Sequence, residues 1–325
     1  MSKFVLITGA GGQDAYFTSK YIKRNTNYSI YGVSNNDYSK YLGKESLKFF
    51  DYFEKISLCQ HEKLSQLINN ISPIYIFNFG AVAGSLTQFN EPNKLIETNS
   101  LSILNILETL KSAKLKTKLI QASSSEIFAA NNEFKQQISS LRKPRTIYGA
   151  SKIFSDSLIE VYRKQYDIDC FSAILFSHES PLRKNDYFSK KIINQIFDYT
   201  EKKINKIKIY SPMAKRDWGY AGDYCSYIAK KALSDNKSDI LVGSGVPHTV
   251  KDFAEEALSH FNLSYNDVVE EIDLPKNRAS EESYVFLDPK SMDSCLTQCI
   301  KYDLGKLVNL LIRHMKLTRY KKDIL

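Results

Sequence analysis

The sequence predicts an α/β fold, with a doubly wound parallel sheet and a smaller C-terminal lobe. In the first half of the chain, short apolar runs alternate with longer segments of helical periodicity. Such alternation is typical of parallel sheets built from strand–helix–strand units. A glycine-rich turn follows the first apolar run, and the alternation becomes less regular after about residue 177. We therefore expect one large sheet domain followed by a second, smaller lobe.

The predicted strands are short apolar runs rich in β-branched and aromatic residues. In chain order they cover residues 4–8, 29–33, 55–58, 74–79, 118–122 and 171–176. No Pro-, Gly- or Ser-rich linker separates the two halves of the chain. The two lobes are therefore expected to share one compact body with a cleft between them.

Two of the predicted helices carry apolar residues on more than one side. One lies around residues 101–110 and the other follows Tyr148. Their apolar residues are Leu101, Ile103, Leu104, Ile106, Leu107 and Leu110 in the first, and Ile153, Phe154, Leu158, Ile159 and Tyr162 in the second. A helix that is apolar on two sides is buried on two sides. The second side is expected to lie either in a dimer interface or beneath the later part of the chain.

Composition and charge exclude several classes of protein. The 325 residues are 43% hydrophobic and 12% aromatic, enough to bury a large core. The formal net charge is +9, but basic residues are interspersed with acidic ones. Because no basic stretch alternates with aromatic residues, we predict an ordinary solvated surface and no nucleic-acid partner. An anionic small-molecule substrate remains compatible with this charge.

The cysteines and the apolar runs indicate where the protein works. Its five cysteines show no CxxC spacing, and its five histidines do not cluster with them. Neither a metal site nor a disulfide framework is predicted, and reduced thiols favour a cytoplasmic protein. The first apolar run is too short for a signal peptide, and no run is long enough to span a membrane.

The glycine-rich turn predicts a dinucleotide site of the Rossmann type. Gly9 and Gly12 allow the backbone to turn tightly and to approach a pyrophosphate, and Ala15 is small enough for the following helix to lie close to the sheet. The predicted cofactor contacts in this turn are Gly9, Gly12, Gln13 and Asp14. A turn with a purely structural role is the alternative.

The end of the second predicted strand bears on which dinucleotide binds. A carboxylate at this place binds the ribose 2′-hydroxyl of NAD, whereas basic or small polar residues accommodate the 2′-phosphate of NADP. The residues are Ser34, Asn35 and Asn36. Without an acidic residue they favour NADP, with Ser34 and Asn35 as contacts. NAD remains open because an arginine is missing as well.

Catalytic residues are predicted from a Tyr and a Lys four residues apart. Six tyrosines have this spacing, namely Tyr16, Tyr148, Tyr187, Tyr199, Tyr227 and Tyr302. Only Tyr148 follows a strand that ends in a serine cluster and Glu126. Tyr148 and Lys152 share one helix face, so the ammonium is expected to lower the pKa of the phenol. Ser124 would bind the same substrate oxygen as Tyr148.

Glu126 adds a carboxylate beside this hydroxyl cluster. A tyrosine, a lysine and a serine suffice for an epimerase or a ketone reductase, but an elimination also needs a base at a carbon atom. Glu126 is therefore predicted to be that base. Its alternative role is to cap the next turn of the chain.

Six stretches of the sequence, in this order along the chain, resemble one known family. They are residues 8–14 (TGAGGQD), 121–126 (QASSSE), 148–152 (YGASK), 175–181 (LFSHESP), 215–219 (KRDWG) and 248–250 (HTV). They resemble the extended short-chain dehydrogenase/reductases and, among these, the GDP-mannose 4,6-dehydratases. The likeness covers nearly the whole chain.

The resemblance implies a nucleotide-sugar site in the cleft, with the sugar lying over a bound nicotinamide. It implies a dinucleotide-binding domain over residues 1–177, which carries the catalytic residues, and a partly interleaved substrate lobe over residues 178–325. It places Tyr148 and Lys152 beside the cofactor as well as the sugar. By motif match, the substrate-binding residues are Ser177, Lys190, Arg216, Arg278 and Glu281. A homodimer or homotetramer is also expected.

The expected function is therefore that of a lyase, a nucleotide-sugar 4,6-dehydratase. GDP-mannose or a related GDP-sugar would be the substrate. Ala83 and Gly84 replace a Ser-His pair of the family, so the pocket is expected to admit a larger sugar such as GDP-manno-heptose. The alternatives are a nucleotide-sugar epimerase or ketoreductase and a non-catalytic dinucleotide sensor. The intact Tyr148–Lys152 pair argues against the sensor.

Overall fold

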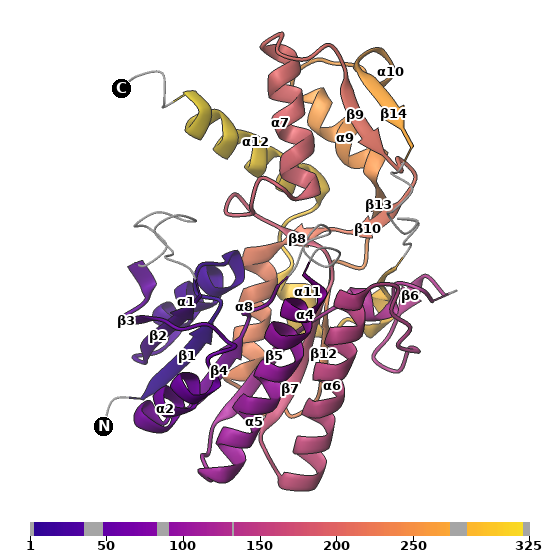
Figure 1. The fold of residues 1–325 in the computed structure, drawn as a ribbon. Helices are drawn as coiled ribbons and strands as arrows, with labels where there is room; N and C mark the ends of the chain where they lie inside the picture. Colours follow the sequence, from indigo (N-terminus) through magenta and orange to yellow (C-terminus); the bar gives the residue numbers. More distant parts are fainter. Residues whose placement is uncertain (1–2, 36–47, 83–90, 132, 274–284, 321–325) are drawn as a thin grey trace.

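The computed structural model describes residues 3–35, 48–82, 91–131, 133–273 and 285–320 (Figure 1). Its centre is a parallel sheet of seven strands in the order β12-β7-β5-β4-β1-β2-β3. The strands are β1 (Phe4–Thr8), β2 (Ser29–Ser34), β3 (Tyr52–Lys55), β4 (Tyr75–Asn78), β5 (Lys118–Ser124), β7 (Cys170–Leu175) and β12 (Ile240–Val242). The predicted α/β fold with a doubly wound parallel sheet is confirmed.

Helices cover both faces of this sheet (Figure 1). One face carries α2 (His61–Ile71), α5 (Ser102–Ser112) and α6 (Ile147–Tyr166). The other carries α1 (Gln13–Asn25), α8 (Ala221–Ala232) and α11 (Ser294–Cys299). The short helix α4 (Pro92–Ile96) and the π-helical turn η3 (Glu97–Leu101) lead into α5, and the 3₁₀ turn η4 (Ser125–Phe128) follows β5.

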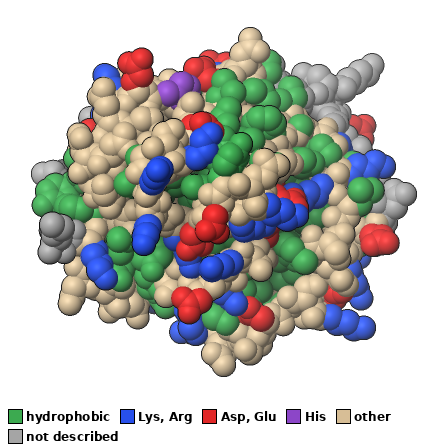
Figure 2. All heavy atoms as spheres, turned by 90° about the horizontal axis from the view of Figure 1, so that it is seen from below, with side chains coloured by type: hydrophobic (Ala, Val, Ile, Leu, Met, Phe, Trp, Pro, Cys, Tyr) green, Lys and Arg blue, Asp and Glu red, His purple; other side chains and the backbone are tan. Residues whose placement is uncertain are grey.

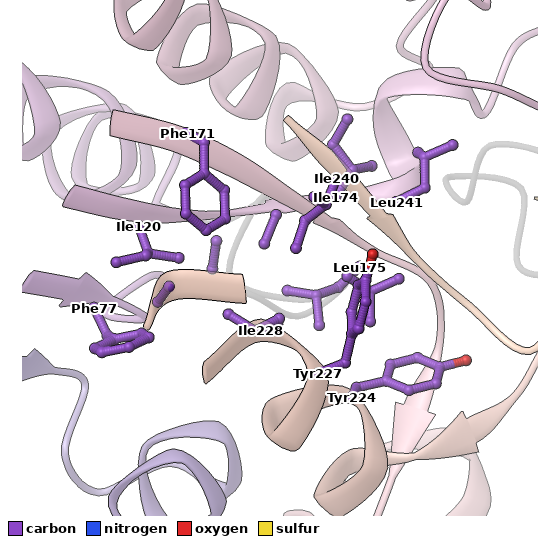
Figure 3. Close-up of a cluster of buried hydrophobic side chains, with 14 of the residues drawn as sticks. Phe77, Ile120, Phe171, Ile174, Leu175, Tyr224, Tyr227, Ile228, Ile240 and Leu241 are labelled. Atoms are coloured by element: carbon purple, nitrogen blue, oxygen red, sulfur yellow. The ribbon is translucent and has the colours of Figure 1, made fainter. Parts of the chain in front are cut away.

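The hydrophobic core follows from the alternation of side chains along each strand. In β1, Val5 and Ile7 belong to the cluster on the α1 and α8 side, whereas Leu6 belongs to the cluster on the α2 and α5 side. Figure 3 shows the first of these clusters, in which Tyr227 and Ile228 of α8 lie with residues of β4, β5 and β7. Because both faces are covered, the strands read as nearly continuous apolar runs.

The second lobe has its own core. It contains α7 (Phe188–Thr200), α9 (Val250–Ser259), α10 (Tyr265–Val268), α12 (Leu304–Tyr320) and the paired strands β9 (Ile207–Tyr210) and β14 (Val269–Ile272). Trp218 lies in this core and stacks on Phe188, with ring centroids 5.5 Å apart. The single tryptophan of the chain therefore stabilises the lobe from inside.

Short strands and turns connect the two parts. The strands are β6 (Lys135–Gln136) with β15 (Phe286–Leu287), β8 (His178–Glu179) with β11 (Gly219–Tyr220), and β10 (Lys215–Asp217) with β13 (Pro247–Thr249). The 3₁₀ turn η5 covers Pro289–Ser291. Asp217, at the end of β10, is 1% exposed and accepts hydrogen bonds from the backbone N–H groups of Ser244, Gly245 and Leu287. A buried carboxylate thus ties these segments together.

Two of the sequence-based strand assignments differ from the structure. The third strand was expected at residues 55–58 but lies at Tyr52–Lys55, because an edge strand needs no apolar run: Tyr52 stacks on Tyr31 of β2, and its ring is half exposed. The apolar Ile56 and Leu58 that suggested the strand enter the core after it ends. The short strand β12 was not predicted.

β12 and α8 interleave the two halves of the sequence. Both follow residue 177, yet β12 pairs with β7 in the central sheet and α8 packs on α1. Residues 221–242 thus complete the body built around the central sheet. The domain boundary at residue 177 stays a prediction.

The helices that were expected to be buried on two sides keep exposed apolar residues. Leu101 of η3 is 42% exposed and Phe154 of α6 is 44% exposed, so the part of the chain that the structure describes does not cover this side of η3 and α6. Seen from below, Lys and Arg side chains lie among Asp and Glu side chains on the surface (Figure 2). Within the described residues, no helix is both long and apolar enough to cross a membrane. All five cysteines are free thiols.

Candidate active site

The turn after β1 has the geometry of a phosphate-binding loop. Gly9 has a φ of 68°, which residues with a side chain rarely adopt. A Cβ atom at this position would lie 2.8 Å from the backbone nitrogen of Gly80. The amide of Gly12 donates to the Gly9 carbonyl over 2.8 Å and closes the turn. The loop is compact enough for a pyrophosphate to reach its backbone.

Helix α1 begins directly after this turn, with Gly12 as its N-cap. Among the described residues, no side chain caps its first turn. The positive end of a helix dipole and its first N–H groups attract anions. The residues present therefore fit a dinucleotide, which Gly9 and Gly12 would hold through the backbone.

Gln13 and Asp14, predicted as cofactor contacts, bind protein groups in this structure. Gln13 donates to the carbonyl of His178 over 3.2 Å and accepts from Ser180 over 2.7 Å. The Asp14 carboxylate lies 3.0 Å from Nε2 of His178. These side chains join the dinucleotide turn to the segment that enters the second lobe. That they also contact the cofactor stays a prediction.

Asp14 and His178 form a hydrogen-bonded pair. Burial raises the pKa of Asp14 and lowers that of His178, but their mutual attraction and hydrogen bond outweigh burial in both groups. The pKa of Asp14 therefore ends below its ordinary value, and the pKa of His178 ends above it.

The end of β2 places Ser34 and Asn35 at the carboxyl edge of the sheet. Ser34 is half-buried and lies opposite Lys55 of β3 in the strand register, and Asn35 is exposed. Lys55 was not considered from the sequence, because it was expected at the start of the third strand (residues 55–58), whereas it ends β3 in the structure and so lies at the carboxyl edge. Asn36 lies outside the described residues.

The structure brings the predicted catalytic residues together. Ser124 ends β5 and caps η4, where its Oγ accepts from the amide of Glu126 over 3.3 Å. Tyr148 lies in the first turn of α6, and the Ser124 side chain hydrogen-bonds to it. Nζ of Lys152 lies 5.6 Å from the centroid of the Tyr148 ring. Glu126 is half-buried at the same end of the sheet.

Gly149 sets how closely the helix approaches this turn. A Cβ atom at Gly149 would lie 2.7 Å from the backbone oxygen of Glu126, which is closer than real Cβ contacts. α6 therefore presses on η4 at the residue next to Tyr148. The glycine allows the tyrosine and the carboxylate to share one site.

Replacing Gly149 with Ala is expected to push α6 away from η4. Overpacking of this kind costs about 1–3 kcal/mol, and we expect a lower Tm together with a kcat that falls more than KM rises. Gly305→Ala is the matched control, because its Cβ would meet only the flexible end of Glu256, at 3.2 Å. Thermal melts and steady-state kinetics of both variants check this, and a normal kcat in Gly149→Ala would contradict it.

The pKa of Tyr148 differs from the sequence-based expectation. Burial raises it well above its ordinary value, and the hydrogen bond from Ser124 and the charge of Arg183 lower it only in part. The ammonium of Lys152 instead donates to the carbonyl of Ala122 over 2.8 Å. The pKa of Tyr148 therefore lies above its ordinary value in this structure, and the lowering expected from Lys152 stays a prediction. Burial, the largest effect, also lowers the pKa of Lys152 itself, to about 8.

Two residues near this site were missed in the sequence. Asn99 of η3 is 2% exposed, hydrogen-bonds to both backbone groups of Val82, and lies 3.3 Å from Oγ of Ser151 in α6. Single π-helical turns often occur at functional sites, and the polar run at residues 97–100 between apolar helical positions was the available signal. Arg183 stacks on the ring of Tyr187 at 3.6 Å and pairs with Glu179.

The predicted substrate residues occupy the segments that join the two lobes. The carbonyl of Ser177 accepts from the amide of Gly219 over 2.9 Å, so the LFSHESP and KRDWG stretches lie side by side. Lys190 is 3% exposed and donates to the Pro181 carbonyl over 3.0 Å; burial lowers its pKa. Arg216 is half-buried in β10, opposite His248 of β13.

Arg278 and Glu281, also predicted to bind substrate, lie outside the described residues, as do Ala83 and Gly84. The roles of Ser177, Lys190 and Arg216 toward a substrate stay predictions. In the structure, the carbonyl of Ser177 and the ammonium of Lys190 form hydrogen bonds with neighbouring segments of the chain.

Comparison with known proteins identifies the family. A family model described as GDP-mannose 4,6 dehydratase matches residues 6–311. The GDP-mannose 4,6 dehydratase of Cricetulus griseus is 26% identical over 269 residues, which cover 79% of this chain and 72% of the relative. That of Dictyostelium discoideum is 24% identical and covers 94% of both chains.

Solved structures agree with this fold. A dTDP-glucose 4,6-dehydratase from Streptomyces venezuelae with NAD and TYD bound has a TM-score of 0.81 at 16% identity, covering 97% of this chain and 98% of that one. A UDP-glucose 4-epimerase from Thermotoga maritima has a TM-score of 0.82 at 18% identity, covering 97% and 99%. Since the family model extends from β1 into α12, the chain belongs to the GDP-mannose 4,6-dehydratase family, a family of sugar-nucleotide lyases within the short-chain dehydrogenase/reductase superfamily.

Proposed function

We propose that this protein converts GDP-mannose or a related GDP-sugar, such as GDP-manno-heptose, to its 4-keto-6-deoxy product. One observation carries the proposal: Glu126 stands beside Ser124 and Tyr148 at the carboxyl end of β5. A tyrosine, a serine and a lysine move a hydride and a proton at one carbinol. The added carboxylate supplies the base that an elimination requires.

Tyr148 takes the proton of the C4 hydroxyl as C4 is oxidised. Ser124, which hydrogen-bonds to the phenol, binds the same oxygen and orients it. Lys152 adds positive charge behind the phenol and stabilises its anion. A nicotinamide cofactor, when bound, would supply the hydride acceptor and donor of the reaction.

Glu126 acts at the next carbon atom. Once C4 is a ketone, the C5 proton is acidic, and the Glu126 carboxylate removes it. The C6 hydroxyl then leaves as water, with a proton from the Glu126 carboxyl. Transfer of the proton held by Tyr148 to C5, together with hydride supplied to C6, would complete the product, so the net change is the loss of one water.

NADP or NAD is the proposed cofactor. Gly9 and Gly12 hold the pyrophosphate, Tyr148 and Lys152 face the nicotinamide, and Ser34 with Asn35 accompanies the adenosine ribose. The position of Lys55 opposite Ser34 supports NADP, because an ammonium there would attract a 2′-phosphate.

The nucleotide diphosphate of the substrate is proposed to bind Ser177, Lys190 and Arg216, together with Arg278 and Glu281. Guanidinium and ammonium groups match the charge of a pyrophosphate. The exposed apolar residues of η3 and α6, including Leu101 and Phe154, support a homodimer or homotetramer formed through these segments.

A panel of nucleotide sugars tests the proposal. Purified protein is incubated with GDP-mannose, GDP-manno-heptose and the corresponding UDP- and dTDP-sugars, and the alkaline chromophore of a 4-keto sugar is measured. Mass spectrometry of the denatured protein identifies the cofactor. We expect a 4-keto product from a GDP-sugar, and clear preference for the hexose would end the heptose idea. Interconversion of sugars without the chromophore would instead make the protein an epimerase.

A further inference from the structure

A buried carboxylate that the reaction does not use lies one helical turn after Lys152. Asp156 of α6 is fully buried. One of its oxygens accepts from Ser123 Oγ in β5 over 2.7 Å, and the other accepts from Ser172 Oγ in β7 over 2.7 Å. The carboxylate thus bridges one helix and two neighbouring strands.

The same strand end also binds Lys152. Its ammonium donates to the carbonyl of Ala122, the residue before Ser123, and its side chain is buried. Residues four apart on a helix are neighbours on its surface. Lys152 and Asp156 therefore attach the same face of α6 to consecutive residues of β5.

The charges around Asp156 leave it without a close cation among the described residues. One guanidinium nitrogen of Arg142 lies 4.0 Å from the Asp156 carboxylate, and another lies 3.9 Å from the carboxylate of Asp239. Asp239 also pairs with Arg163 at 2.8 Å. The other charged neighbour is Lys152, on the same helix. Burial raises the pKa of Asp156 to about 6, in spite of the two serines and Arg142 that lower it. The carboxyl is thus charged at neutral and higher pH.

We propose that Asp156 is a positioning residue for Lys152: its buried carboxylate keeps the lysine protonated and holds it against the end of β5. Burial alone favours a neutral lysine. The carboxylate of Asp156 is the largest effect that opposes burial in Lys152, and the next is Asp14. A Lys152 that lost its proton would no longer stabilise the Tyr148 phenolate.

The pKa values of Asp156 and Lys152 determine the direction in which the pH–rate profile should move. Asp156 is charged above about pH 6, and Lys152 is protonated below about pH 8. Removing the Asp156 charge lowers the pKa of Lys152, so activity is lost at a lower pH. The basic limb of the pH–rate profile should therefore move downward.

The Asp156→Asn variant tests this with two measurements. We expect the basic limb of kcat to move down by about one pH unit, with kcat near pH 6.5 little changed. The second measurement is the titration of the Lys152 ε-carbon by NMR in protein carrying ¹³C-labelled lysine, assigned with Lys152→Met. It should show the same shift without any substrate. The role of Lys152 in the reaction rests on the proposed function, whereas the titration of Lys152 is measured without any reaction. The effect of Asp156 on Lys152 can therefore be tested even if the proposed function fails.

Two further variants make the test specific. Asp223→Asn removes another buried carboxylate, which accepts from the backbone amides of Lys301 and Tyr302; it should lower Tm and leave the titration of Lys152 unchanged. Arg142→Met removes a cation that lowers the pKa of Asp156, so the titration of Asp156, seen as a step in the Lys152 ε-carbon shift, should move to higher pH even if Asp156→Asn does not fold. An unchanged Lys152 titration in folded Asp156→Asn, or a Lys152 ε-carbon shift in Arg142→Met without this step, would overturn the proposal.

Discussion

Replacing Glu126 with Gln is expected to abolish formation of the 4-keto-6-deoxy product while the nucleotide sugar still binds. Loss of a general base at carbon costs about 10²- to 10⁴-fold in rate. The substituted glutamine keeps the size of the side chain, and the backbone amide of this residue still donates to Ser124. The turn η4 should therefore persist, and only the proton transfer at C5 and the departure of the C6 hydroxyl should fail.

Single-turnover experiments separate these steps. In Glu126→Gln, the near-ultraviolet absorbance of the reduced nicotinamide should still appear after mixing with substrate, because oxidation at C4 does not need this carboxylate. Exchange of the C5 hydrogen with deuterated solvent should disappear. The exposed Glu133 offers the matched control, and Glu133→Gln should behave as the wild type. Undiminished turnover in Glu126→Gln would remove the case for a dehydratase.

Replacing Tyr148 with Phe is expected to stop the reaction one step earlier. Without the phenol no group takes the C4 proton, so we expect at least about a 10²-fold loss of kcat. No reduced nicotinamide should accumulate in a single turnover, in contrast to Glu126→Gln. Because burial holds the pKa of this phenol well above its ordinary value, wild-type activity should rise with pH until Lys152 loses its proton.

Tyr199→Phe is the control for the tyrosine variant. Tyr199 lies in α7 of the second lobe and has Lys203 four residues later, so it shares the spacing of the catalytic pair but not its place. We expect wild-type kinetics. If Tyr148→Phe still reduced the nicotinamide at the wild-type rate, another group would have to be the base.

The sequence was sufficient for the elements whose residues act locally. Gly9 needs a positive φ, and Tyr148 and Lys152 lie on one helix that follows the serine cluster of β5, so these could be identified from spacing together with their place in the chain. β1 was placed at its observed bounds because it is buried from Val5 to Thr8. β3 was misplaced because an edge strand half exposed to solvent carries no apolar run, and its position is set by pairing with β2.

The residues that were missed depend on contacts between distant segments. The role of Asn99 follows from its hydrogen bonds to Val82 and Ser151, and Arg183 comes near Tyr148 only because the second lobe folds back. Spacing also did not reveal that the pKa of Tyr148 lies above its ordinary value. Helical neighbours share a face, but burial of both groups, which is a property of the whole site, has the larger effect on each pKa.

The position of β12 has a consequence for how the chain folds during synthesis. β7 is buried along its whole length, but until residues 240–242 have left the ribosome it is an open edge with unpaired backbone groups. The nascent chain must therefore carry an exposed apolar strand while α7 and the strands after it are still being made. We expect this stretch of synthesis to be the one in which the protein most needs a chaperone.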